Sequence, residues 1–450
     1  MTQLATESLW AKVESQKARI PSMYGAMDFS VIPERFTTRP GDPTQLREKR
    51  PGQRDAVLAD QDRVELVRAY SMMGDLVADA YAALMRQYGF RALVEMLIAA
   101  CDHGVEEVVD APPELVAFIG DMERRPEWVD MALVEEGARL DRNLAANFSP
   151  FIIRGAFIAT FMNKYSALPM AITNTLSSET AGRRVKETAT FFTTSVLPGA
   201  LERFGPGFKA AAMVRLMHSM VRANVLRRPG DWDMRVYGMP IPQVDQMPAG
   251  LIPIFLMAER MLSEGRTEFT PAERARVELS RYRCFLLGLP EDLLADTPQG
   301  IIDLMSTRNA TLRQEYDDGT CGELLRATMA ADLRSGGGVV ENVRAFFEQR
   351  LAKLFFLRNF MNGNREVSAA IGVKVGTSDI LIAAAAGLFI TARIKLYALA
   401  ARVPGLREAA DRRLVAKLER QLASYGKAHF TTDAAHYRPT GSAQPAGVMR

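Results

Sequence analysis

The residue in this chain best suited to chemistry is a histidine inside an apolar, arginine-flanked helix. The stretch VRLMHSMVR contains His218, one of four histidines in 450 residues. On a helix over residues 207–227, its face also carries the positions three, four and seven away, which are Ala211, Val214, Val221, Arg222 and Val225. The imidazole is therefore predicted to point into the protein.

Two interpretations of His218 are open from these residues. The ordinary one is a core histidine satisfied by one or two hydrogen bonds. A site built from protein ligands alone is disfavoured, because the other histidines stand at no ligand spacing such as HxxxH from it. A haem iron, by contrast, needs only one protein ligand, because the porphyrin supplies four nitrogens. Arg215 and Arg222, one turn to either side, could pair with its propionates, although arginines beside a buried helix are more often ordinary snorkelling side chains.

A second group of chemically useful residues lies in the stretch RRVKETATFF, residues 183–192. On a helix, Arg184 and Thr188 share one face, and Phe191 and Phe192 extend it by another turn. This face offers a charge, a hydroxyl group and an apolar wall. An amphipathic helix with a solvated or capped arginine is the alternative interpretation, and the residues alone favour it.

Helices must position these groups, because apolar residues recur at three- and four-residue spacing almost throughout the chain. We therefore predict an all-α fold. Residues 1–58, rich in Pro, Arg and Gly, are expected to form an irregular N-terminal arm, and residues 59–290 a helical core. Residues 291–430 are expected to pack as helices on that core, and 431–450 to form a polar tail. The proline-rich stretch 229–253 is predicted to be a fixed loop.

Composition narrows the class of protein. The chain has 56 basic and 53 acidic residues, a net charge of +3, with both signs interspersed, which disfavours nucleic acid as a partner. Its three cysteines are far apart in sequence and predict neither disulfides nor a thiolate metal site. The N-terminus resembles no export signal, so we expect a cytoplasmic protein.

One apolar run bears on membranes. Ile380–Ala392 falls short of the roughly 20 residues that cross a bilayer. We interpret it as a buried helix and expect no transmembrane segment, with contact at a membrane surface left open.

Three motifs in order carry a family resemblance. They are the Arg184-x-x-x-Thr188 helix, the helix with Arg215, His218 and Arg222, and the loop WDMRVYGMPIPQVD, which supplies Gly238, Pro240, Ile241 and Asp245. Together they resemble the superfamily of latex clearing proteins and mycophenolic-acid prenyl-chain oxygenases. We place the resemblance over about residues 60–290.

The resemblance implies a globin-like helical core around one buried b-type haem, with His218 as the proximal iron ligand. It places Arg184 and Thr188 near the distal side or the haem edge as catalytic residues, where they would donate hydrogen bonds to O2 or to a propionate. Arg215 and Arg222 would help to bind the cofactor. One departure matters: the rubber-cleaving branch has a lysine directly before the distal threonine, where this chain has Glu187. Lys186 is displaced by one residue, about 100° of helical rotation.

These expectations point to a haem b-dependent oxygenase acting with O2 on an unsaturated, hydrophobic small molecule such as a prenyl chain, lipid or natural product. Because no export leader is visible, polyisoprene is not the substrate we expect. Two alternatives remain from the residues. One is a haem-binding sensor or carrier without turnover, and the other is an all-α interaction protein without a cofactor, in which His218 is a core residue.

Overall fold

The predicted all-α fold is confirmed. The computed structural model describes residues 3–172, 180–227, 230 and 232–426. Among these residues β-structure is limited to two isolated bridges, Phe36 with Leu312 and Thr44 with Arg313. The predicted polar tail, 431–450, lies outside the described residues.

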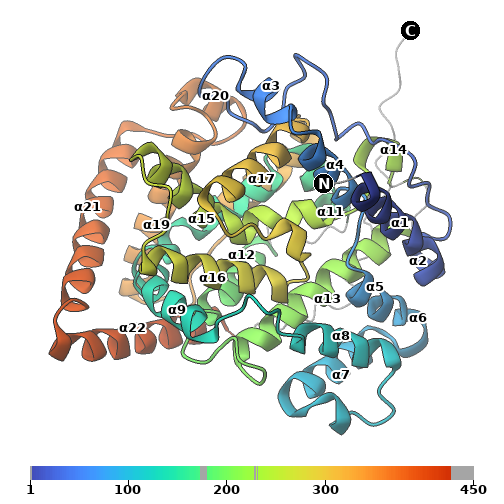
Figure 1. Cartoon of the computed structure of the whole chain (residues 1–450). Coiled ribbons are helices and arrows are strands. Elements are labelled where there is room, and N and C mark those ends of the chain that lie inside the picture. Colours follow the sequence, from blue (N-terminus) through green and yellow to red (C-terminus); the bar gives the residue numbers. More distant parts are fainter. Residues whose placement is uncertain (1–2, 173–179, 228–229, 231, 427–450) are drawn as a thin grey trace.

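The helices of the first half of the chain run from the N-terminal segment to the long central helix α13 (Figure 1). They are α1 (Gln3–Arg19), α2 (Pro21–Tyr24), α3 (Gln53–Leu58), α4 (Gln61–Tyr70), α5 (Leu76–Ala83), α6 (Met85–Tyr88), α7 (Phe90–His103), η1 (Val105–Glu107), α8 (Pro113–Glu123), α9 (Met131–Asn147), α10 (Ser149–Ile158), η2 (Ala159–Phe161), α11 (Lys164–Ile172), α12 (Ala181–Thr194) and α13 (Pro206–Leu226).

The second half continues with α14 (Met234–Tyr237), α15 (Gln243–Ser263), α16 (Pro271–Leu286), η3 (Glu291–Leu293), α17 (Pro298–Thr311), η4 (Asp318–Gly322), α18 (Glu323–Ala330), α19 (Val339–Asn359), α20 (Arg365–Ala370), α21 (Thr377–Ala400) and α22 (Pro404–Tyr425).

Local sequence signals fix where several of these helices begin. Asp75 caps α5 by accepting a hydrogen bond from the backbone N–H of Ala78, and Asp130 caps α9 in the same way. Thr270 and Glu273 form a reciprocal capping box on α16. Pro206 occupies the first turn of α13, where its missing N–H costs no helical hydrogen bond.

Helix α13 lies near the middle of the molecule and is surrounded by α5, α7, α11, α12 and α16 (Figure 1). Most of its residues are buried, so it forms part of the main hydrophobic core. Close packing elsewhere in this core depends on a small residue. A Cβ at Gly137 of α9 would lie 2.2 Å from the carbonyl oxygen of Ala275, so α16 could not approach α9 as it does.

The irregular N-terminal arm predicted over residues 1–58 is corrected in part: residues 25–52 contain no helix, but α1, α2 and α3 lie on either side of them. Helix α1 packs against α4 and α5, and Leu9, Val13 and Tyr24 belong to the main core. The spacing of Leu9 and Val13 is that of a buried helical face, which the many polar residues around them concealed. The remaining domain boundaries stay predictions.

The fixed loop predicted over 229–253 is also corrected in part. Helix α15 already begins at Gln243 and carries Pro248 and Pro253 inside it. Its first turns therefore hold side chains at helical spacing in a stretch that we expected to be irregular.

The apolar run Ile380–Ala392 does not form the buried helix that we expected. It lies in α21, at the left edge of Figure 1, and much of its surface faces outward. Among the described residues, α21 is the one unbroken helix long and apolar enough to cross a membrane, and the bent pair Met131–Asn147 and Ser149–Phe161 would add a second if counted as one span.

Candidate active site around His218

His218 occupies the middle of α13 and keeps an accessible surface where its neighbours have none. Met217 and Ser219 are buried, whereas His218 is partly exposed, as are Val214 and Val221 on the same face. At these three positions, the face predicted to point inward is therefore less buried than the rest of the helix around it.

The imidazole is held by a chain of side-chain amides from α15. His218 Nδ1 lies 3.1 Å from Gln246 Oε1, Gln246 Nε2 donates to Gln243 Oε1 over 3.1 Å, and Gln243 Nε2 donates to the carbonyl oxygen of Gly74 over 3.1 Å. The last acceptor is a backbone carbonyl, which can only accept a hydrogen bond. Gln243 must therefore turn its NH2 group to Gly74, and each amide along the chain has one orientation that satisfies its neighbours.

This chain of donors fixes the tautomer of the histidine. Because Gln246 presents an oxygen to His218, Nδ1 must carry the proton and donate it. The lone pair of the ring then resides on Nε2. Burial lowers the pKa of His218 to about 4, opposed by the hydrogen bond with Gln246 and reinforced by the charge of Arg222. The ring is therefore neutral at pH 7 and chemically competent to bind a metal through Nε2.

The two arginines beside His218 are paired with carboxylates of the protein. Arg215 contacts Asp75 (Nη2 to Oδ1, 2.9 Å) and Asp121 (2.8 Å), and Arg222 pairs with Asp79. All but Asp121 are buried. Two positive charges spaced two turns apart on α13 thus meet two negative charges spaced one turn apart on α5. The pairs neutralise one another, and they fix α13 against α5.

The loop before α15 completes the contacts of Arg222. Its guanidinium group donates to the carbonyl oxygens of Pro240 (3.0 Å) and Ile241 (2.7 Å). Ile241 adopts a positive φ of 47°, which is uncommon for a β-branched residue and turns its carbonyl toward the arginine. Asp245, the last residue of the loop motif, pairs with Arg35 at 2.6 Å. The motif therefore orients the start of α15, from which Gln246 reaches His218.

Helix α12 packs against α13 and carries Arg184 and Thr188. Both side chains are partly exposed on one face, while Val185 and Ala189 between and beyond them are buried. The charge of Arg184 contributes to the lowered pKa of His218, which places the two side chains within electrostatic range. Arg184 Nη1 donates to Glu187 Oε2 over 2.9 Å, so its charge is compensated locally.

Lys186 is engaged elsewhere. Its Nζ donates to the carbonyl oxygen of Arg334 over 2.9 Å and approaches the hydroxyl of Ser335 at 3.4 Å. This contact agrees with the sequence expectation that a lysine displaced by one residue turns away from the face of Arg184 and Thr188. Glu187 occupies the position before Thr188, and it is buried against Arg184.

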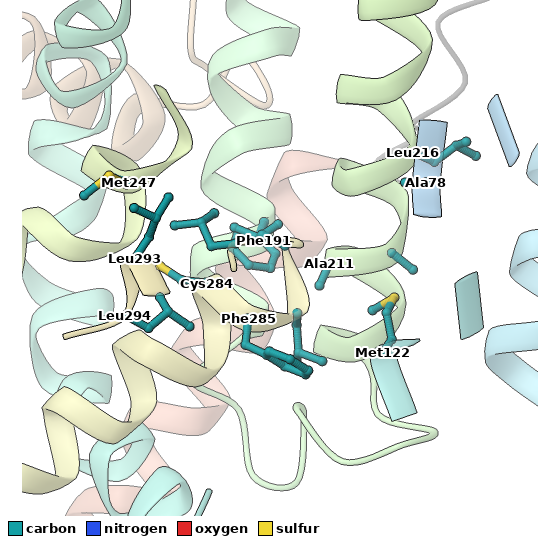
Figure 2. Close-up of a cluster of buried hydrophobic side chains, with 14 of the residues drawn as sticks. Ala78, Met122, Phe191, Ala211, Leu216, Met247, Cys284, Phe285, Leu293 and Leu294 are labelled. Carbon is teal, nitrogen blue, oxygen red and sulfur yellow. The ribbon is translucent and has the colours of Figure 1, made fainter. Parts of the chain in front are cut away.

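The aromatic residues that could wall a substrate channel do not form one surface. Phe191 is buried in the main core, and Figure 2 shows it among Cys284, Phe285 and Ala211. Phe157 and Phe161 belong to a second buried cluster. Core packing accounts for Phe157, Phe161 and Phe191. Phe192 is partly exposed and packs against the main core.

Sequence reasoning missed the residues that hold His218 and its helix in place. Gln243 and Gln246 lie in the stretch read as a loop, although their spacing of three residues was visible. Asp75 and Asp79 lie about 140 residues from their arginine partners, and nothing local marks them as partners. All three cysteines are free and buried. No cluster of three or more metal-binding side chains occurs in the part of the chain that the structure describes.

Comparison with known proteins now adds an independent finding. Residues 142–355 match a family model described as the catalytic domain of ER-bound oxygenase mpaB/B′ and rubber oxygenase. This segment of the chain belongs to that oxygenase family. The match begins later and ends later than the 60–290 range that we placed on the resemblance. It contains α12 and α13 whole, and with them Arg184, Thr188 and His218.

A solved structure supports the family at the level of fold. The chain is similar to the structure of latex clearing protein LCP in the closed state, with a TM-score of 0.53 and 19% identity, over 79% of this chain and 91% of that one. At this identity the likeness shows a shared helical fold. No curated protein matches the sequence. The family supports the prediction of an oxygenase; the individual site roles stay predictions.

Proposed function

We propose that the protein is a haem b-dependent oxygenase that acts with O2 on an unsaturated, hydrophobic small molecule, with His218 as the proximal iron ligand. The observation that carries this proposal is the chain of amides from Gly74 through Gln243 and Gln246. It keeps Nδ1 protonated and leaves the Nε2 lone pair for a metal, which is the arrangement typical of metal-bound histidine.

The protein's own residues would divide the remaining tasks. Haem bound at His218 would supply the iron that activates O2 for attack on a carbon–carbon double bond or a neighbouring C–H bond. Thr188 would donate a hydrogen bond from its hydroxyl group to O2. Arg184, steadied by Glu187, would offer its remaining N–H groups to O2 or to a carboxylate of the cofactor. Because Glu187 compensates its charge, the face stays close to neutral, which suits an apolar substrate.

Arg215 and Arg222 take a positioning role in this proposal. Their carboxylate partners and the Pro240 and Ile241 carbonyls contact both guanidinium groups and hold α13, and with it His218, in place. Arg215 Nη1 is buried without a hydrogen-bond partner. Their predicted contacts with haem propionates would have to compete with these pairs.

The substrate class follows from the family and from the expected site. The matched family includes rubber oxygenase and an ER-bound oxygenase, names that belong to those proteins. For this chain we propose a small unsaturated lipid-like molecule and a cytoplasmic location, where three free buried cysteines are at no risk of mispairing.

Oxygen consumption with a matched pair of hydrocarbons tests the proposal. Squalene and squalane share a carbon skeleton but differ in their double bonds. The haem-loaded protein is expected to consume O2 with squalene and not with squalane, and the Thr188→Ala variant to do so more slowly. A protein that binds haem but consumes no O2 with either, or with other prenyl chains and unsaturated lipids, would be the sensor or carrier instead.

A further inference from the structure

Helix α21 presents an apolar face to solvent along most of its length. Leu381, Leu388, Phe389 and Leu396 are 66%, 75%, 65% and 65% exposed. At 100° of rotation per residue, all four fall within one outward half of the helix, together with Ala385, Ala392 and Leu399. Soluble proteins place polar residues on such a face. On this helix of 24 residues the apolar stripe runs from Leu381 to Leu399, a length of about 27 Å.

The inner side of α21 is anchored to the protein. Ala383 and Ile390 are buried, Lys353 of α19 bonds to Asp379 at the start of the helix, and Asn143 of α9 donates to the carbonyl oxygen of Ile394. These contacts run along the helix and hold it flat on the molecular surface. A helix held in this way cannot cross a bilayer, but it can lie in the plane of a bilayer surface.

Cations surround the apolar stripe. Lys374 precedes the helix, Lys395 lies beside the stripe, and Arg402 follows it, all three exposed. Residues 371–410 contain five basic residues and two acidic ones, Asp379 and Glu408, and Asp379 is paired with Lys353. The charge left at this edge of the molecule is therefore positive, as in surface helices that bind anionic lipids.

We propose that the outward face of α21 docks on a lipid bilayer that contains anionic headgroups. The apolar side chains would enter the boundary between headgroups and acyl chains, while Lys374, Lys395 and Arg402 would meet lipid phosphates and carboxylates. A second copy of the chain is the less favourable occupant. An antiparallel pair would bring Lys374 of one copy opposite Arg402 of the other, two like charges beside an apolar contact.

Co-sedimentation with vesicles tests this surface directly. The full-length protein is expected to bind vesicles of phosphatidylcholine with about 30% phosphatidylserine more tightly than pure phosphatidylcholine, and to release as salt rises. The double variant L388Q/F389Q is expected to lose affinity at least about tenfold, since each side chain contributes apolar burial. The matched control F204Q/L256Q changes one Phe and one Leu of similar exposure elsewhere on the surface, and it is expected to bind like the wild type.

A reporter at the same position separates membrane insertion from other causes. In the Phe389→Trp variant, the tryptophan fluorescence is expected to shift to the blue on vesicles and to be quenched by brominated lipid. The Leu256→Trp variant is expected to show neither effect. The proposal is overturned if the wild type ignores vesicles, if L388Q/F389Q binds as the wild type does, or if the stripe instead supports a concentration-dependent dimer without vesicle binding. Docking on vesicles requires neither haem nor O2. The docking proposal can therefore fail while the oxygenase proposal stands, and the oxygenase proposal can fail while docking stands.

Discussion

Replacing Gln246 by leucine tests the link between the amide chain and cofactor binding. The change keeps the approximate size of the side chain but removes the only atom placed to accept from His218 Nδ1, now 3.1 Å away. A buried donor left without an acceptor costs about 1–3 kcal/mol. Loss of a hydrogen-bond partner behind a metal-binding histidine typically lowers metal affinity about 10–100-fold, or about 1.4–2.8 kcal/mol, which is the same range.

The assay measures the transfer of haem from each variant to an excess of apomyoglobin. The change in Soret absorption reports the rate of transfer. We expect Gln246→Leu to release haem about 10–100-fold faster than the wild type. Gln246→Glu keeps an acceptor oxygen at the same position and is expected to retain most of the affinity. Gln421→Leu, which removes a buried glutamine from α22, serves as the matched control. Wild-type haem retention by Gln246→Leu would refute the argument from the amide chain.

Three further predictions follow from the same site. Thr188→Ala should keep the haem and its Soret band but slow product formation, measured by O2 uptake. Arg222→Met should lower the free energy of unfolding by about 3–5 kcal/mol in urea titrations, because Asp79 would remain buried without its partner. His218 should make stability depend on pH: its pKa is about 4 in the fold against 6.5 in an unfolded chain, so the apoprotein should lose up to about 3 kcal/mol as the pH falls from 6.5 to 4.

The sign of the pH effect follows from proton binding. Between pH 6.5 and 4 the unfolded chain holds a proton on His218 that the folded protein excludes, so acid favours unfolding in that window. His218→Ala should lack this component. Equal acid sensitivity of the two proteins would contradict the buried, neutral histidine.

The prediction for Arg222 has its own control. The double variant Arg222→Met/Asp79→Asn should recover most of the stability lost in Arg222→Met. Failure to recover it would show that the unpaired charge of Asp79 does not cause the loss.

Periodicity predicted what depends on local spacing. The all-α class follows from apolar residues three and four apart. The spacing of Arg184 and Thr188, both partly exposed on α12, also placed these two residues on one face. The family motifs on α12 and α13 lie inside the matched segment, 142–355, whose bounds differ from the 60–290 range that we placed on the resemblance.

What the sequence could not show depends on contacts between distant segments. Gln246 lies in a stretch whose prolines argued against a helix, yet Pro248 and Pro253 are accommodated inside α15. The pairing of Arg222 with Asp79 joins residues 143 positions apart. The exposure of α21 was predicted wrongly. An apolar run has the same sequence pattern whether it is covered by the rest of the protein or by another surface.

The most direct test of the central claim is the absorption spectrum of the purified protein, air-oxidised and then reduced with dithionite, beside His218→Ala and His103→Ala. His103 ends α7 on the surface and provides a control for general effects of losing a histidine. The account predicts a Soret band that shifts on reduction, persists in His103→Ala and is lost in His218→Ala with helix content preserved. A Soret band retained by His218→Ala, or absent from the wild type even after reconstitution with haem, would contradict it.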